Sequence, residues 1–352
     1  MGDLIPGVER IAVLRAGGLG DFVFALPALE SLRAAYPAAE ITLLTGPRHH
    51  ELLEKRPGPW DIVEVVPPYP GVRDEEDPGE SAEAFLQRMR DRRFDLAVQM
   101  HGGGRHSNHL IRGLGAGTTV GCRTVDALPL DIELPHIYRH SEAIRWLELI
   151  ALVGGRFRSP SPRLAATAED IAAAHEVLPP TTVTGPLVTL HPGAGSPRRR
   201  WPVAEFARLA DDLTRAGARV VLVGGPEDSQ LTGAVCHEMD EAAVDLGGRV
   251  SLSALVGLFA RASLHVGNDS GPAHIARAVA PSTLTLVWGP NMITAGPIGP
   301  ADHHRAVLGW AVNCPDCGVL VVDHACPHES SIVADIELDE VRSNALELLG
   351  LP

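Results

Sequence analysis

Short apolar runs alternate with longer segments of helical periodicity in the first half of the chain. The apolar runs predict buried strands at residues 10–15, 40–44, 62–66 and 96–100. The segments between them predict helices over residues 21–36 and 80–92. Because short strands that alternate with helices form parallel sheets covered on both faces, this half is expected to be an α/β domain.

The second half repeats the pattern. Its apolar runs and helical segments predict strands at residues 187–190, 218–223, 243–245, 262–266 and 282–288 and helices at 202–216, 229–238, 252–260 and 275–280. A proline-rich stretch, residues 179–186, predicts a linker between the halves. The sequence therefore predicts two Rossmann-like domains, residues 1–178 and 179–335, whose parallel sheets face each other across a cleft. A final helix is expected within residues 336–352, and its docking side stays open.

The composition disfavours some classes of partner. The 352 residues carry a formal net charge of −14, which argues against a nucleic-acid-binding protein. Since no strongly basic run offsets that charge, firm residence on an anionic membrane is disfavoured and only peripheral contact stays open. No stretch is apolar over the length of a membrane span, and the N-terminus lacks the features of a signal peptide. We therefore expect a cytoplasmic protein.

A run of small and polar residues follows the predicted strand at 262–266 and precedes a predicted helix. Its chemistry-bearing members are Asp269, Ser270, Gly271, Ala273 and His274. A strand, a tight turn and a helix N-terminus together form a place where backbone N–H groups can bind a phosphate. The alternative is that Asp269 or Ser270 only caps the helix.

A glycine-rich loop also follows the first predicted strand. The segment from Arg15 to Asp21 lacks the G-x-G-x-x-G spacing, and no acidic residue ends the second strand, so a nicotinamide-dependent oxidoreductase is disfavoured. Asp21 stands at the start of a helix, where a carboxylate commonly serves as an N-terminal charge or cap. At the carboxyl end of a central strand, it can instead act as a general base toward an attacking hydroxyl.

Basic residues follow the first predicted strand of the second half. After His191 and Gly193 the loop reaches Arg199 and Arg200, directly before a Trp-Pro helix start. Arginine at that position suits a leaving diphosphate, which it can hold bidentately while negative charge develops. A charge run on a surface can also be merely solvated.

An acidic pair ends the loop after the strand at 218–223. Either Glu227 or Asp228 could accept a hydrogen bond from a ribose hydroxyl, and the sequence does not separate them. Asp228 could also simply cap the helix that follows.

These loops together carry a family resemblance. The segments concerned are Gly20-Asp21, Leu26-Pro27-Ala28-Leu29, His191-Pro192-Gly193, Arg200-Trp201-Pro202, Gly224-Gly225-Pro226 and Asp269-Ser270-Gly271-Pro272-Ala273-His274. In the order and spacing of these segments the chain resembles glycosyltransferase family 9, the bacterial ADP-heptose heptosyltransferases. The resemblance runs through most of the chain. It implies the GT-B architecture, with the acceptor bound by the first domain and the nucleotide-sugar donor by the second.

The resemblance also implies roles for individual residues. Asp21 would be the base of an inverting displacement. Arg199 stands where the family often has lysine and keeps the positive charge, so it would assist the departing diphosphate. The implied donor-binding residues are His191, Gly193, Arg200, Glu227, Asp228, Asp269, Ser270, Gly271, Ala273 and His274. The acceptor candidates are Gly20, His101 and Arg105, although the stretch around His101 could equally be a plain connection.

The expected function is transfer of a heptose, or a related sugar, from an ADP-sugar to an acceptor hydroxyl without a metal. A lipopolysaccharide core acceptor is the family default. Two alternatives stay open: a transferase acting on a small antibiotic or another surface glycan, and a nucleotide-sugar-binding protein without transfer activity.

Five cysteines, an odd number, do not suggest a disulfide framework. Three of them, Cys314, Cys317 and Cys326, lie close together in sequence and precede His328. Three thiolates and an imidazole could bind zinc. Reduced structural thiols are the favoured interpretation, so no cofactor is predicted.

Overall fold

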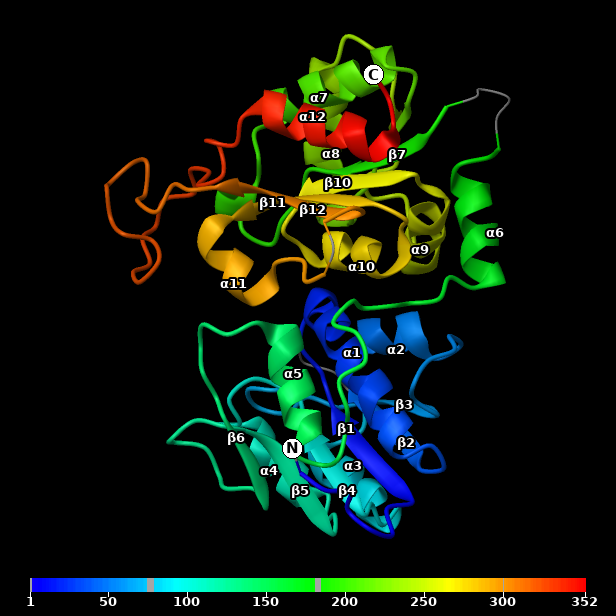
Figure 1. Ribbon diagram of the computed structural model, residues 1–352, viewed down its shortest axis with the longest axis vertical. Coiled ribbons are helices and arrows are strands. Elements are labelled where there is room, and N and C mark those ends of the chain that lie inside the picture. The colour runs from blue at the N-terminus through cyan, green and yellow to red at the C-terminus, as the bar shows by residue number, and fades with distance from the viewer. Residues whose placement is uncertain (1, 75–78, 181–184, 300) are drawn as a thin grey trace. The chain divides into compact units, whose positions relative to one another are not determined.

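The computed structural model describes residues 2–74, 79–180, 185–299 and 301–352. The chain divides into two compact units, Met1–Ala165 and Ala166–Pro352. Residues 181–184 of the predicted linker lie outside the described residues. Each unit contains a six-stranded sheet whose paired strands are parallel, with helices on both faces (Figure 1). The predicted α/β class with two Rossmann-like sheets is therefore confirmed.

The first unit has the strand order β3-β2-β1-β4-β5-β6. Its strands are β1 Arg10–Leu14, β2 Glu40–Thr45, β3 Ile62–Val65, β4 Leu96–Gln99, β5 Thr118–Arg123 and β6 Ile132–Pro135. Its helices are α1 Leu19–Ala35, α2 Pro47–Leu53, α3 Ala82–Asp91, α4 Ser107–Gly113 and α5 Glu142–Ala151. β1 and β4 are neighbours although the chain leaves them toward opposite edges of the sheet, so this is the topological switch point, where α/β proteins bind ligands.

Apolar side chains of the central strands pack on helices of the first unit. Ala12 and Leu14 of β1 share a buried cluster with Phe85 and Met89 of α3 and Leu110 of α4. On the other face α1 packs against α5. α1 tolerates Pro27 in its interior. These contacts bury β1 on both faces and fix the position of the loop that follows it.

The second unit has the order β12-β11-β10-β7-β8-β9. Its strands are β7 Leu187–His191, β8 Arg219–Leu222, β9 Val244–Asp245, β10 Leu264–Asn268, β11 Thr283–Trp288 and β12 His304–Gly309. Its α-helices are α6 Ala168–Val177, α7 Val203–Arg215, α8 Ser229–Glu238, α9 Leu252–Arg261, α10 Gly271–Val279, α11 Met292–Ala295 and α12 Leu338–Leu349. The neighbours β7 and β10 form its switch point, with Leu264 opposite Val188 and Gly267 opposite His191.

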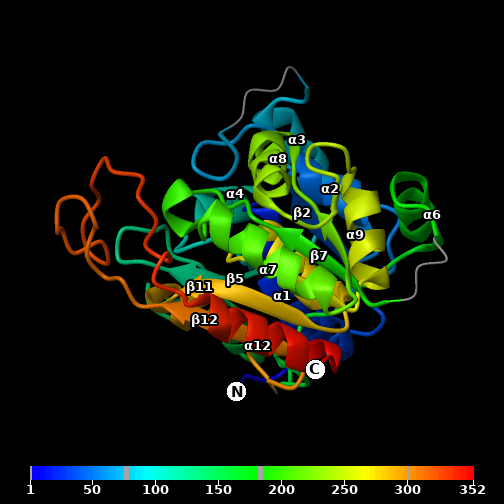
Figure 2. The same ribbon diagram turned by 90° about the horizontal axis from the view of Figure 1, so that it is seen from above.

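Helices α7, α8 and α12 cover one face of the second sheet, and α9 and α10 cover the other (Figures 1 and 2). Helix α6 packs against α9. The C-terminal helix packs against α7 and the sheet, with Val341 and Ala345 fully buried. None of the helices in the described ranges combines the length and the apolar character that a membrane span requires.

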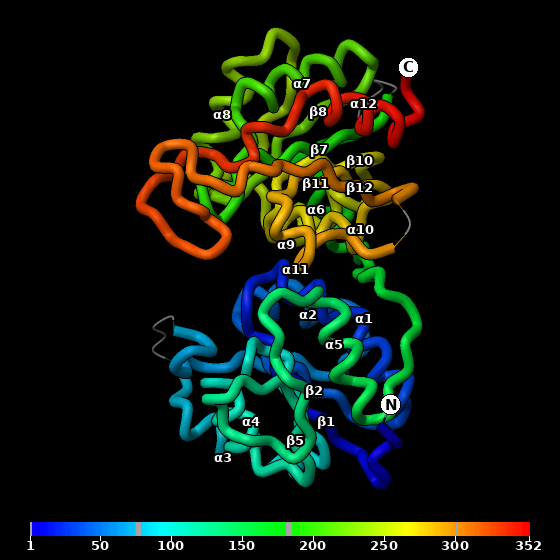
Figure 3. The backbone as a smooth tube through the Cα atoms, turned by 60° about the vertical axis from the view of Figure 1, so that its left-hand side comes forward, coloured from blue at the N-terminus to red at the C-terminus, as the bar shows by residue number. Residues whose placement is uncertain are grey.

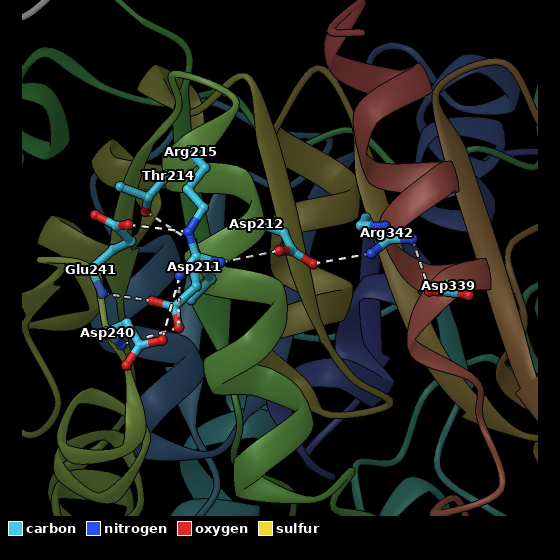
Figure 4. Close-up of polar contacts among 9 residues, drawn as sticks. Asp211, Asp212, Thr214, Arg215, Asp240, Glu241, Asp339 and Arg342 are labelled. Carbon is cyan, nitrogen blue, oxygen red and sulfur yellow. Dashed lines mark hydrogen bonds and ion pairs between the residues drawn. The ribbon is translucent and has the colours of Figure 1, made fainter.

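Charged side chains support the α7 and α12 contact from the surface (Figure 4). Arg342 of α12 donates to Asp212 of α7 at 3.3 Å and to Asp339 at 2.8 Å. At the other side of α7, the carboxylate of Asp211 accepts the backbone N–H groups of residues 240 and 241 at 3.1 and 2.8 Å. The predicted final helix thus docks within the second unit.

Candidate functional site

The predicted donor residues of the second unit lie on loops at one edge of its sheet. The loops follow β7, β8, β10 and β11, and in a parallel sheet the carboxyl ends of all strands share an edge. Hydrogen bonds between side chains of different loops, described next, join them into one site.

Asp269, directly after β10, is the most densely bonded carboxylate of this site. Its Oδ2 accepts from Asn291 at 2.9 Å and from Arg199 at 3.3 Å, and His274 Nε2 lies 3.1 Å from Oδ1. The Asp269 side chain is 5% exposed, whereas Arg199 is a third exposed. Burial alone would raise the pKa of Asp269, but the bond and charge of His274, then Asn291 and Arg199, hold this pKa below its usual value. Asp269 thus stays anionic and fixes an arginine that faces solvent.

His191, the last residue of β7, links the loops after β8 and β10. Its Nε2 lies 3.1 Å from Asp228 Oδ2, and its Nδ1 lies 3.2 Å from the Ser270 hydroxyl. All three side chains are buried. Burial opposes ionisation of Asp228, yet the bond and charge of His191, the Gly225 N–H and the charge of Arg200 lower its pKa below the usual value.

The helix that begins after Ser270 has no side-chain cap from its own N-cap residue. Ser270 occupies the N-cap position of α10, but its hydroxyl bonds to His191. The serines before α3, α5 and α9 do accept a backbone N–H of their helices. The first turn of α10, which holds Gly271 and Ala273, therefore presents backbone donors that suit an anion.

Gly193, after β7, and Gly224, after β8, both lie against the side chain of Asp228. A Cβ on Gly193 would lie 2.2 Å from Asp228 Oδ1, and one on Gly224 would lie 2.6 Å from Asp228 Cβ. Both glycines therefore make room for this carboxylate. The neighbouring Glu227 is exposed. The acidic pair thus splits into an inward residue bonded to His191 and an outward residue facing solvent.

The arginine segment is held in place by its backbone. Asn268, the last residue of β10, accepts the Trp201 N–H at 3.0 Å and donates to the Pro192 carbonyl at 2.7 Å. The guanidinium of Arg200 folds back onto the Ala194 carbonyl at 3.1 and 3.3 Å. From the far end of the unit, the Ser331 hydroxyl donates to the Arg200 carbonyl at 2.7 Å. The backbone around Arg199 and Arg200 is therefore held by Asn268 of β10 and by Ser331 of the loop after β12.

In the first unit, Asp21 lies in the first turn of α1 and its side chain is 54% exposed. Its Oδ2 accepts the Gly18 N–H at 3.1 Å, and Gly20 is buried beside it. Arg15, buried at the end of β1, donates to the Asp21 carbonyl at 2.6 and 3.0 Å and to the Met100 carbonyl at 2.7 Å. The Arg15 guanidinium also lies over Trp146 and 3.8 Å from the Asp21 carboxylate. The Asp21 carboxylate is therefore accessible, while the backbone that carries it is held in place by Arg15.

The two other acceptor candidates of this unit differ in burial. His101 follows β4 and is partly buried; burial first, then the charge of Arg15, lower its pKa to about 4. Arg105 is 72% exposed and lies 3.5 Å from Asp126. His101 is thus a neutral group near Arg15, and Arg105 is a surface ion-pair member.

The cysteines grouped by sequence also meet in space. The thiols of Cys314, Cys317 and Cys326 and a ring nitrogen of His328 all lie within 4.8 Å of one another, and we call these four residues the Cys3His cluster. All five cysteines of the chain are free. No metal was predicted from the sequence, but the structure brings together four atoms that could ligate one.

The family of the chain follows from a comparison with protein-family models. The model of glycosyltransferase family 9 (heptosyltransferase) matches residues 82–315, more than half of the chain. The chain belongs to this family. Lipooligosaccharide heptosyltransferase 2 of Haemophilus influenzae is 36% identical over 111 residues, 30% of this chain and 32% of that protein. The alignment thus spans about a third of the length of that relative.

Solved structures of family 9 share the fold over nearly the whole chain. A family 9 glycosyltransferase from Veillonella parvula superposes with a TM-score of 0.79 and 22% identity, covering 97% of each chain. ADP-heptose lipopolysaccharide heptosyltransferase II of Escherichia coli gives 0.76 and 20% identity over 97% of this chain and 98% of that one. The GT-B type of fold inferred from the sequence is therefore confirmed.

Two residues that support these loops, one in each unit, were not predicted from the sequence. Asn268 supports the arginine segment, and Arg15 supports Asp21. Both stand at the end of a central strand, which is the signal that could have identified them. The bond of Asn291 to Asp269 was likewise not predictable, because it depends on β11 lying beside β10.

Proposed function

We propose that this protein is an inverting glycosyltransferase that moves a heptose, or a related sugar, from an ADP-sugar to an acceptor hydroxyl, by family default in lipopolysaccharide core synthesis. The observation that carries the proposal is the group around Asp269. A buried carboxylate directs a partly exposed arginine beside a helix start whose N-cap hydroxyl is bonded elsewhere. Fixed cationic and N–H donors at one point suit a diphosphate.

The donor diphosphate would be held by Arg199, by Arg200 and by the first turn of α10 from Gly271 to Ala273. As the bond between the anomeric carbon and the diphosphate breaks, these groups neutralise the departing charge, so the step needs no metal ion. Asp269 and His191 are bonded on both sides and act as positioning residues. Since Asp228 is bonded to His191, we assign the ribose contact to the exposed Glu227.

The base would be Asp21. Its carboxylate takes the proton of the acceptor hydroxyl while the hydroxyl oxygen attacks the anomeric carbon from the face opposite ADP, which inverts the configuration. Arg15 holds the backbone of Asp21 from beneath and keeps the carboxylate at a fixed position. The exposure of half of this side chain leaves it accessible to an acceptor.

Two measurements test the proposal. Equal concentrations of ADP, UDP and GDP are compared for the rise in melting temperature that they cause, because a ligand of the folded state must stabilise it. ADP is expected to stabilise most. Transfer from ADP-heptose is then followed for the wild type, Asp21→Asn and the exposed control Asp91→Asn.

We expect D21N to lose transfer by at least about 10²-fold while its affinity for ADP stays within about twofold of the wild type. D91N should behave as the wild type. Full turnover by D21N would overturn the assignment of the base, and selective stabilisation by UDP or GDP would overturn the ADP-sugar donor.

A further inference from the structure

The Cys3His cluster lies outside the donor and acceptor residues. It sits in the long loop after β12, which projects from the second unit at the end of that strand (Figures 1 and 3). Between Gly309 and Leu338 the described chain forms no helix or strand of more than an isolated bridge. Such a loop has little core of its own, so its conformation needs another source of stability.

The first two cysteines stand on a tight turn. The Cys314 carbonyl accepts the Gly318 N–H at 2.9 Å, and the Cys314 N–H donates to the Val319 carbonyl at 2.8 Å. Gly318 has a φ of 72°, which a glycine adopts without strain. The turn thus places the Cys314 and Cys317 thiols within 4.8 Å of each other.

The remaining two residues close the set from the other end of the loop. Cys326 and His328 are separated by one proline, and both are partly buried. His328 Nδ1 is buried and has no hydrogen-bond partner among the described residues. A buried nitrogen without a partner costs free energy, and a bond to a metal ion would satisfy it.

We propose that the Cys3His cluster binds one Zn²⁺ ion in tetrahedral coordination. Three thiolates and one imidazole are a donor set of structural zinc sites, and soft thiolates favour Zn²⁺ over Mg²⁺ or Ca²⁺. Zn–S bonds of ~2.3 Å require neighbouring sulfurs ~3.8 Å apart. The ligand atoms already lie within 4.8 Å, so a small contraction is enough. Since four protein ligands leave no open position, the ion is structural.

The ion would tie the loop to the arginine segment. Three residues after His328, the Ser331 hydroxyl donates to the Arg200 carbonyl at 2.7 Å, and the Ile332 N–H donates to the Arg198 carbonyl at 2.8 Å. A metal ion that closes the loop at the cluster would reduce the loss of conformational entropy that accompanies formation of these two contacts. This consequence rests on the proposed function, whereas the metal site itself does not.

The test is the metal content of the whole protein, purified without chelators and measured by mass spectrometry. We expect about one zinc per chain in the wild type and in the control Cys236→Ser, which alters a thiol outside the cluster, and less than a tenth of that in C317S and C326S. Co²⁺ exchanged into the wild type should give the intense visible absorption of tetrahedral thiolate coordination, and C317S should not.

A second measurement does not depend on the variants folding. In the wild type, the cluster thiols should be protected from a thiol reagent and become reactive when a strong chelator removes zinc, with a lower melting temperature. Metal-free wild type, or a disulfide within the cluster of the native protein, would overturn the proposal. One iron per chain, lost in C317S, would support the site and overturn zinc. Zinc-loaded protein that fails to bind ADP would contradict the proposed function alone.

Discussion

Arg199 donates to Asp269 at 3.3 Å, although the two residues are 70 positions apart in the chain. The carboxylate is buried, and the guanidinium is a third exposed. An anion in the interior therefore determines where a cation at the surface points. Because Asn291 and His274 hold the same carboxylate, Asp269 stays in place when a ligand approaches Arg199.

Replacing either member of this pair should weaken transfer. Arg199→Gln removes a positive charge from the proposed diphosphate site, so kcat/KM for ADP-heptose should fall by about 10²-fold or more. Asp269→Asn should lower it by about tenfold, since the arginine loses its charged partner. Steady-state kinetics and calorimetric titration with ADP measure both effects.

The double variant decides whether the two residues act together. If Asp269 works through Arg199, R199Q/D269N should lose little more activity than R199Q alone. Arg208→Gln, an exposed arginine on α7 paired with Glu205, is the control and should retain activity. Additive losses in the double variant would contradict the pairing.

The glycine before the arginine segment should not tolerate a side chain. In Gly193→Ala the new Cβ would lie 2.2 Å from Asp228 Oδ1, so the bond to His191 must shift. We expect a loss of about 1–3 kcal/mol in the free energy of unfolding, together with weaker ADP binding. Gly195→Ala, on the same loop, meets only Arg199 at 3.7 Å and should stay within about 0.5 kcal/mol of wild type. Urea unfolding of both variants measures the difference.

Arg15 should not be replaceable by lysine. Its guanidinium donates to two carbonyls at once, those of Asp21 and Met100, and one ammonium group cannot reproduce that fork. Arg15→Lys should cost about 2–3 kcal/mol of unfolding free energy and should also lower transfer. The control is Arg10→Lys at the start of β1, where the exposed arginine makes one hydrogen bond to a carbonyl. Equal stabilities of the two variants would refute the role.

The stability of the second unit should fall in mild acid. His265 is buried between Thr189 and Phe259, and burial, then the charge of His191, lower its pKa from 6.5 to about 3. The unfolded chain can bind a proton at His265 that the folded chain excludes. The full contribution of neutral His265 to the free energy of unfolding is therefore present above pH 6.5. It is lost as the pH falls toward 3, by about 1.4 kcal/mol per pH unit.

Urea unfolding at a series of pH values checks this dependence. The slope between pH 6.5 and 4 should shrink by about one proton in His265→Asn. It should stay at the wild-type value in His237→Asn, which changes an exposed histidine of α8. A slope unaltered in H265N would show that this histidine does not cause the acid sensitivity.

Most of the strands that were predicted from the sequence contain several neighbouring apolar residues. β7, β8, β10 and β11 lie in the centre of a parallel sheet, where both faces are buried, so apolar residues recur along each of them and polar members such as Thr189 and His265 are buried as well. Three strands toward sheet edges were not predicted. β5 carries Thr118, Thr119 and Arg123, β6 holds Glu133, and β12 begins with His304 and Arg305. β6 and β12 are partly exposed, whereas β5 is mostly buried, but in all three strands polar residues interrupt the apolar pattern and make it too weak to recognise.

The candidate site was predictable as a set of loops but not as a set of bonds. Small residues after apolar strands indicated where the loops meet. Which carboxylate turns inward was not predictable, because Glu227 and Asp228 are neighbours of similar chemistry. Their difference depends on His191, which lies 37 residues from Asp228. A pairing of that length becomes visible only when the strand order is known.

In each sheet a buried side chain connects the ends of the two central strands. Arg15 at the end of β1 reaches the Met100 carbonyl beyond β4, and Asn268 at the end of β10 reaches the Pro192 carbonyl beyond β7. The paired registers of β1 with β4 and of β10 with β7 end next to these residues. Beyond them, the Arg15 guanidinium and the Asn268 amide connect the two chain segments. The loops that follow are thus ordered before any ligand arrives. Nucleotide binding should therefore freeze few additional torsions, so its thermodynamic signature should be a small entropy penalty and a rapid, one-step association.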